Sequence, residues 1–101
     1  MIRSFRHRGL KRFFERGERA LIRSDLLHRV EVMLAQLDVA SSPEAMRIPN
    51  YRLHALKGDL KGYWSVRVKT NWRIIFRFED EDVHDVELVD YHYRKEKPPC
   101  L

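Results

Sequence analysis

Side chains that can move protons and bind phosphate gather in two short segments of the sequence. His54 and Lys57 lie in LHALKG, and Asp90, Tyr91 and His92 follow one another in VDYH. Metal-free cleavage of RNA needs a base for the 2′-hydroxyl, an acid for the departing 5′-oxygen, and cations for the charged transition state. A tyrosine can also stack on a base. The two segments therefore supply every kind of group that this reaction requires.

The same residues allow a second interpretation as metal ligands. His54, Asp90 and His92 are two histidines and one carboxylate, which are ligand types that transition metals accept. Their positions follow no ligand-spacing motif. We therefore expect acid–base chemistry without a metal, and keep the metal site as the alternative.

Basic residues repeat along two strand-like segments that are close together in the sequence. Apolar and polar side chains alternate from Tyr63 to Thr70 and again from Trp72 to Phe78. Only Thr70 and Asn71 separate the two runs, which predicts an antiparallel hairpin. One face of the hairpin is apolar. The other face collects four cations that we expect to bind RNA: Arg67, Lys69, Arg73 and Arg77.

Two helices are expected before this hairpin. Residues Gly9–Arg16 carry apolar residues at helical spacing, and Gly17 is predicted to end that helix. Ser24 and Asp25 are predicted to cap a longer helix. Its apolar stripe, which we assign to the core, is Leu26, Leu27, Val30, Met33, Leu34 and Leu37.

The remaining strands complete the predicted fold. Residues Ile2–Phe5 form a short candidate strand, and Val83–Tyr91 form the last one, after an acidic turn. The sequence thus predicts an α+β domain with the order β-α-α-β-β-β, in which two helices pack on one face of an antiparallel or mixed sheet. Alternation from Val86 and Leu88 places Asp90 and His92 on the same face as those apolar residues. Either the strand ends or bulges before Asp90, or Asp90 reaches the active face over the sheet edge.

Charge is segregated along the chain of 101 residues, whose formal net charge is +5. Residues 1–29 hold nine Lys and Arg against three acids, and residues 51–77 hold seven against one. Residues 79–87 hold six acids and no Lys or Arg. A basic surface of this kind suits a polyanion such as nucleic acid, although charges that serve only solubility give the same composition.

Composition also limits the cellular context. Cys100 is the only cysteine, so an intramolecular disulfide cannot form. The apolar runs are shorter than a membrane span, and residues 1–14 alternate charged and apolar residues where a signal peptide would have an apolar core. We expect a cytoplasmic protein without membrane contact. It would have one domain over residues 1–93 and a basic, flexible tail over residues 94–101.

Four segments in a fixed order resemble a known family. They are MIRSF, RGLKRFFERG, YRLHALKGDLKGYWSVRVKTNWRIIFRF and VDYH, and together they cover roughly residues 1–93. The sequence resembles the HigB toxins of the RelE/ParE superfamily of bacterial toxin–antitoxin systems. The resemblance implies a RelE-like fold and a ribosome-dependent endoribonuclease that cuts messenger RNA during translation and uses no metal or cofactor.

The resemblance also implies site residues and partners. The active-site cluster of the family falls on His54, Lys57, Asp90, Tyr91 and His92, and its phosphate-binding arginine falls on Arg73. We assign His92 or Asp90 as the base, His54 to assist proton transfer, Lys57 and Arg73 to the phosphate, and Tyr91 to the RNA base. The implied partners are the 70S ribosome with its messenger and a HigA-like helix-turn-helix antitoxin encoded beside the toxin. Operator DNA would be contacted only through the antitoxin.

Two other functions are compatible with the same fold. A ParE-like toxin would inhibit DNA gyrase or another topoisomerase, and a non-catalytic module would bind nucleic acid without cutting it. The proton-transfer residues favour the nuclease over the topoisomerase inhibitor, which does not need them. Binding of RNA without any cleavage product would support the non-catalytic module.

Overall fold

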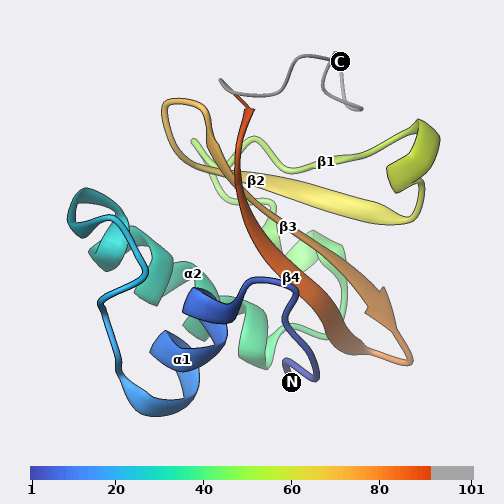
Figure 1. The fold of residues 1–101 in the computed structure, drawn as a ribbon. Helices are drawn as coiled ribbons and strands as arrows, with labels where there is room; N and C mark the ends of the chain where they lie inside the picture. Colours follow the sequence, from blue (N-terminus) through green and yellow to red (C-terminus); the bar gives the residue numbers. More distant parts are fainter. Residues whose placement is uncertain (92–101) are drawn as a thin grey trace.

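A computed structural model describes residues 1–91 as two helices and a four-stranded sheet (Figure 1). The helices are α1 (Arg8–Arg16) and α2 (Leu27–Val39), and the strands are β1 (His54–Ala55), β2 (Tyr63–Lys69), β3 (Trp72–Glu79) and β4 (Asp82–Asp90). Three 3-10 turns complete the fold: η1 (Ser24–Leu26), η2 (Pro43–Met46) and η3 (Gly58–Leu60). The predicted tail over residues 94–101, His92 and Cys100 lie outside the described residues.

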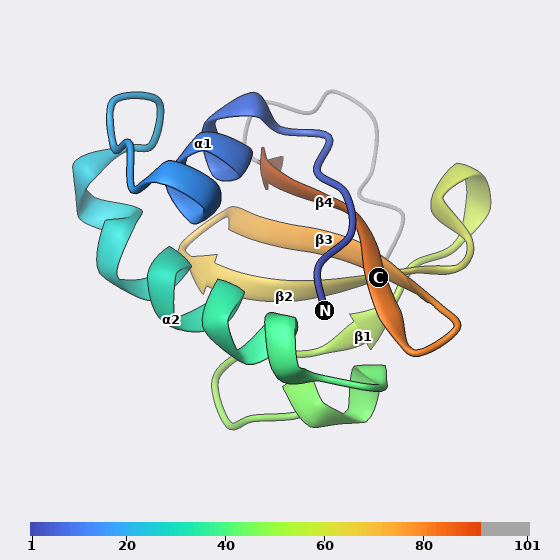
Figure 2. The ribbon, with the colours of Figure 1, turned by 90° about the horizontal axis from the view of Figure 1, so that it is seen from below.

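The sheet is antiparallel in the order β1-β2-β3-β4, and both helices lie on one of its faces (Figures 1 and 2). The predicted N-terminal strand is reduced to two parallel bridges, from Ile2 to Val83 and from Phe5 to Val86. These bridges place the N-terminal segment along the free edge of β4. The α+β architecture with helices on one face is confirmed. The helices among the described residues are too short or too polar to cross a membrane.

One strand was not predicted as a separate element. β1 pairs His54 with Ser65 and Ala55 with Trp64, which adds a two-residue strand at the edge of β2. The chain that leaves β1 then covers part of the second face of the sheet. There Leu56, Ile75 and Val89 form a small second core, which packs against Leu60, Tyr63 and Tyr91. The sheet face opposite the helices is therefore partly covered at its centre.

The first helix ends as predicted, and the second begins differently. Gly17 takes a left-handed conformation (φ 73°), and its N–H donates to the carbonyl groups of the last turn of α1. Ser24 and Asp25 were predicted to cap α2, but they form η1, and neither side chain caps the helix. Asp25 instead pairs with Arg23 and Lys69. The predicted apolar stripe of α2 lies in or against the main core.

A bulge in β4 explains where its side chains point. Phe76 lies opposite two residues of β4, Asp85 and Val86, because the register shifts between Ile75 and Arg77. Asp85 has a left-handed backbone (φ 55°). Its N–H donates to Ser4 Oγ at 2.8 Å, so the bulge is held by the N-terminal segment.

His7 caps the N-terminus of α1. Its Nδ1 accepts a hydrogen bond of 3.1 Å from the N–H of Leu10, which requires a ring nitrogen without a proton. Burial lowers the pKa of His7 below its usual 6.5, and the Glu87 carboxylate opposes this in part. The unfolded chain therefore binds a proton more readily than the folded one. The cap contributes stability above pH 6.5, and this contribution is lost as the pH falls through 6.5 towards the lower folded pKa.

We expect His7→Asn to keep the cap but to remove its pH-dependent contribution to the unfolding free energy. We expect His7→Ala to remove the cap altogether. Asparagine accepts the same hydrogen bond without titrating, so the decrease in unfolding free energy between pH 7.5 and 5.5 should be smaller than in the wild type. His7→Ala should cost about 1 kcal/mol at pH 8. Urea denaturation at each pH measures both effects, with His28→Asn, an exposed histidine of α2, as control. Equal pH slopes for wild type and His7→Asn would contradict the assignment.

Candidate active site

The face of the sheet opposite the helices carries most of the predicted site, and we call it the open face. Residues that pair across antiparallel strands share a face. His54 pairs with Ser65, and Ser65 pairs with Ile75, a member of the second core. Arg67 pairs with Arg73, two residues further along the same face. His54, Arg67 and Arg73 therefore lie on the open face together.

Two arginines converge at the end of this face. Arg67 Nε donates to the carbonyl oxygen of Thr70 at 3.3 Å, and Arg73 Nη1 donates to the same oxygen at 2.7 Å. Arg73 also donates to the Trp72 carbonyl at 3.2 Å, and its guanidinium carbon lies 5.3 Å from the centre of the Tyr91 ring. A carbonyl group orients a guanidinium by accepting its hydrogen bond. The contacts thus place two guanidinium groups beside an aromatic ring, an arrangement that suits a phosphate and its base.

His54 lies two strands away from Arg73. Strand spacing and rise put their Cα atoms roughly 12 Å apart, so both side chains can reach one phosphodiester. The His54 ring is half-exposed, and its Nδ1 lies 2.7 Å from the Arg52 carbonyl oxygen. If Nδ1 carries the hydrogen and donates to that oxygen, Nε2 is left to exchange a proton with substrate. Lys57 is exposed at the start of η3, three residues after His54.

Asp90 and Tyr91, at the end of β4, lie on opposite faces of the sheet. Asp90 pairs with Trp72, whose ring packs against the main core, so this register puts Asp90 on the helix-covered face. Tyr91 packs against the second core on the open face. The bulge at Asp85 precedes Val86, so the alternation of side chains from Val86 to Asp90 is unchanged. β4 ends at Asp90. Asp90 can therefore reach the open face only around the end of the sheet. His92 lies outside the described residues.

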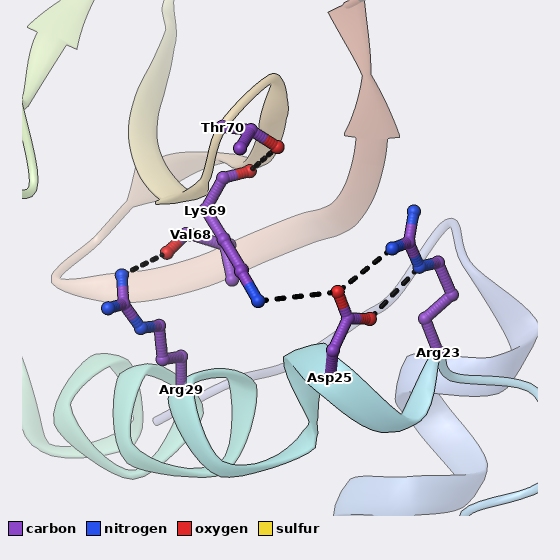
Figure 3. Close-up of polar contacts among 6 residues, drawn as sticks. All are labelled: Arg23, Asp25, Arg29, Val68, Lys69 and Thr70. Carbon is purple, nitrogen blue, oxygen red and sulfur yellow. Dashed lines mark hydrogen bonds and ion pairs between the residues drawn. The ribbon is translucent and has the colours of Figure 1, made fainter.

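Lys69 departs from the surface on which it was predicted. A bulge between Arg67 and Lys69 inserts Val68, so Lys69 pairs with Trp72 and lies on the helix-covered face. Its Nζ lies 3.5 Å from the Asp25 carboxylate (Figure 3). Asp25 also accepts from Arg23, and the two cations lower the pKa of this carboxyl, Arg23 most strongly. Lys69 therefore does not share the open face with Arg67 and Arg73.

Arg77 lies on the open face at its opposite end and is held by two acids. Its Nε donates to Asp85 and its Nη1 to Glu79, both at 2.7 Å. Hydrogen bonds from Arg77 hold the pKa of both carboxyls below their usual range, and the acids raise the pKa of Arg77. Its charge is compensated locally, which favours a role in fixing the β4 bulge over one in binding phosphate.

The turn between β2 and β3 belongs to the site although its residues were interpreted only as a turn. Thr70 has a left-handed backbone (φ 49°), and its carbonyl oxygen receives both arginines. The Asn71 carbonyl accepts the N–H of Tyr91 at 3.0 Å, which ties the end of β4 to the same turn. The sequence signal for this turn was the two-residue spacing between the two strands.

The alternative of a metal site concerns the same predicted residues. Within residues 1–91, His, Cys, Asp and Glu side chains form no group of three that could hold a metal ion.

Comparisons with known proteins identify the family to which this chain belongs. The chain is 40% identical to "Endoribonuclease HigB" of Proteus vulgaris over 91% of its own length and 100% of the relative. It is 35% identical to "Toxin HigB-1" of Vibrio cholerae over 79% of its length and 86% of that protein. A YoeB/ParE toxin from Agrobacterium tumefaciens aligns at TM-score 0.42 and 20% identity, over 68% of this chain and 74% of that one. The family described as the RelE-like toxin of type II toxin-antitoxin system HigB matches residues 3–92. The chain therefore belongs to the HigB family of RelE-like toxins, whose members act in type II systems beside an antitoxin.

Proposed function

We propose that this toxin is an endoribonuclease that cuts messenger RNA on the translating ribosome and so arrests growth. The single observation that carries the proposal is the open face, where His54 and the Arg67–Arg73 pair lie within reach of one phosphodiester. The name of the Proteus vulgaris relative, Endoribonuclease HigB, supports the same chemistry.

The proposed reaction is an attack of the RNA on itself. A base takes the proton of a 2′-hydroxyl, the oxygen attacks the adjacent phosphorus, and the bond to the 5′-oxygen breaks as that oxygen receives a proton. The products are a 2′,3′-cyclic phosphate and a 5′-hydroxyl. Arg73 and Lys57 stabilise the negative charge that grows on the phosphate oxygens, and Arg67 assists from the paired strand.

Proton transfer is assigned to the histidines and Asp90. His54 stands on the open face with a half-exposed ring, so it is the described residue best placed to protonate or deprotonate RNA. Asp90 and His92 remain the proposed base, with Asp90 acting around the end of β4. Tyr91, whose ring lies beside the Arg73 guanidinium, would stack on an RNA base.

The proposed partners follow from family membership and charge. We propose that the antitoxin is a HigA-like helix-turn-helix protein encoded beside the toxin and that operator DNA is contacted only through it. The 70S ribosome presents the messenger in the cytoplasm, and the basic side chains of α1 suit contact with ribosomal RNA.

A reconstituted translation reaction tests the proposal. The wild-type toxin is added to a defined messenger with and without ribosomes, and new RNA ends are mapped and examined for cyclic phosphates. We expect cuts that depend on ribosomes. Absence of cuts at toxin concentrations that arrest growth, together with inhibition of DNA gyrase supercoiling, would overturn the proposal in favour of a ParE-like activity.

A further inference from the structure

A hollow lies beside the open face, where α2 approaches the edge of β2. Its volume is about 490 Å³, and we call it the edge pocket. Three parts of the chain line it: the first turns of α2, the segment Pro49–Tyr51, and the end of β2 with Thr70. β1 pairs only with Trp64 and Ser65, so it leaves this end of β2 uncovered.

The backbone at this uncovered edge is already hydrogen-bonded. The N–H of Arg67 donates to the Tyr51 carbonyl at 2.6 Å. Arg29 Nη1 donates to the Val68 carbonyl at 2.9 Å, which anchors α2 to β2 (Figure 3). These two backbone groups are therefore not available to pair with an added strand. A ligand in the edge pocket would be bound by side chains instead.

The charge of the edge pocket is strongly positive. Arg29, Arg67 and Lys69 line it, and none of the lining residues within residues 1–91 is Asp or Glu. Arg29 and Arg67 are bonded to backbone carbonyls, so their charge is not neutralised by those contacts. Lys69 lies 3.5 Å from Asp25, but Arg23 holds the same carboxylate at 2.8 Å. Three cations in one concave site favour an anion between them.

The remaining lining suits a nucleoside better than a bare anion. Val32, Met33 and the Tyr51 ring give the pocket an apolar side, and Tyr51 is fixed by a 2.7 Å hydrogen bond from its hydroxyl to Gln36. Asn50 adds a side-chain amide with both donors and acceptors. The cations would bind the phosphate, and the apolar side would stack on the base. The amide would form hydrogen bonds with the edge of the base.

We propose that the edge pocket binds one nucleotide of the RNA strand outside the cleavage site. Its phosphate would lie against Arg29, Arg67 and Lys69, and its base against Val32 and Tyr51. Arg67 connects the two sites, because it lines the edge pocket and shares the Thr70 carbonyl with Arg73 on the open face. The strand would thus pass from the open face over the uncovered edge of β2. This inference rests on the proposed nuclease function.

Nuclear magnetic resonance of the full chain tests the pocket directly. The probes are inorganic phosphate, nucleoside 5′-monophosphates, and a short single-stranded RNA with 2′-O-methyl groups, which block attack by the 2′-oxygen. We expect the oligonucleotide to shift the side-chain amide of Asn50, the Thr70 amide and the Arg29 guanidinium. Binding of free phosphate or mononucleotide there without binding of the oligonucleotide would overturn the RNA assignment.

Charge-removing variants measure the contribution of the pocket. Arg29→Gln should weaken oligonucleotide binding about tenfold, and it should reduce the slope of log affinity against log salt by about 0.7, the value for one phosphate on a single strand. The matched control is Arg19→Gln, an exposed arginine before η1 that does not line the pocket. Lys69→Gln provides a second variant in case loss of the Arg29 contact to Val68 impairs folding.

The outcomes separate this inference from the proposed function. The edge pocket is overturned if Arg29→Gln and Lys69→Gln bind the oligonucleotide with wild-type affinity and salt slope and the Asn50 signal does not shift. The proposed function stands in that case if the wild type still cuts RNA on ribosomes. Absence of wild-type cleavage would overturn the function, whichever probe the pocket binds. Losses in both pocket variants but not in Arg19→Gln would support the pocket.

Discussion

His54→Ala is expected to slow ribosome-dependent RNA cleavage by about 10²–10⁴-fold, the range over which one general acid or base contributes. The ring is half-exposed on the open face, and its Nδ1 lies next to the Arg52 carbonyl. Removing the ring takes away a proton-transfer group without opening the main core, since His54 lies outside it. Single-turnover cleavage on stalled ribosomes measures the loss at the chemical step.

The control for this variant is another histidine on the sheet. His84 pairs with Arg77 at the opposite end of the open face and is also half-exposed. His84→Ala should cut at nearly the wild-type rate. His54→Ala with a wild-type rate would remove His54 from the reaction and leave proton transfer to the end of β4.

The fold followed from sequence because its signals are local and periodic. Alternation in β2 and β3 fixed which side chains enter the core: Trp64, Val66, Val68, Trp72, Ile74, Phe76 and Phe78 all lie in or against the main cluster. The two-residue spacing at Thr70 fixed the hairpin, and Gly17 marked the end of α1. Each of these features depends on neighbours within a few residues, which periodicity can reveal.

The errors arise where one residue is inserted into a strand. The bulge at Val68 moves Lys69 to the face of Trp72, and the bulge at Asp85 sets the contacts of Arg77. A bulge depends on a partner strand or a distant segment, as Ser4 does for Asp85, so alternation alone does not reveal it. β1 escaped prediction for a similar reason, since two residues are too few for a period.

The candidate site was predicted in part. Alternation placed Arg67 and Arg73 on one face of the hairpin, where the register puts them. The sequence could not show that Arg67 and Arg73 share the Thr70 carbonyl, because that contact joins a backbone atom to two strands. It also could not show that Lys69 pairs with Asp25, and that Arg77 pairs with Glu79 and Asp85.

Arg73→Gln is expected to reduce cleavage about 10²–10³-fold, as the loss of one donor to a charged transition state does. Glutamine keeps a polar donor but carries no charge, and strand pairing on both sides holds the hairpin, so the turn should keep its conformation while the phosphate loses its cation. Arg73→Lys should fall between wild type and Arg73→Gln, because lysine restores the charge without the planar fork. The measurement is again single-turnover cleavage, with Arg19→Gln as the control of equal charge change.

The order of these three rates tests the electrostatic role against a structural one. If Arg73 served only to hold the hairpin turn, both substitutions would lower the midpoint of urea denaturation, and the rates would follow stability instead of charge. If it binds the phosphate, Arg73→Gln folds like the wild type and binds its antitoxin, yet cuts slowly on the ribosome. A rate for Arg73→Gln close to that of Arg19→Gln would show that the transition-state charge is stabilised by other cations, of which Lys57 and Arg67 are the next to test.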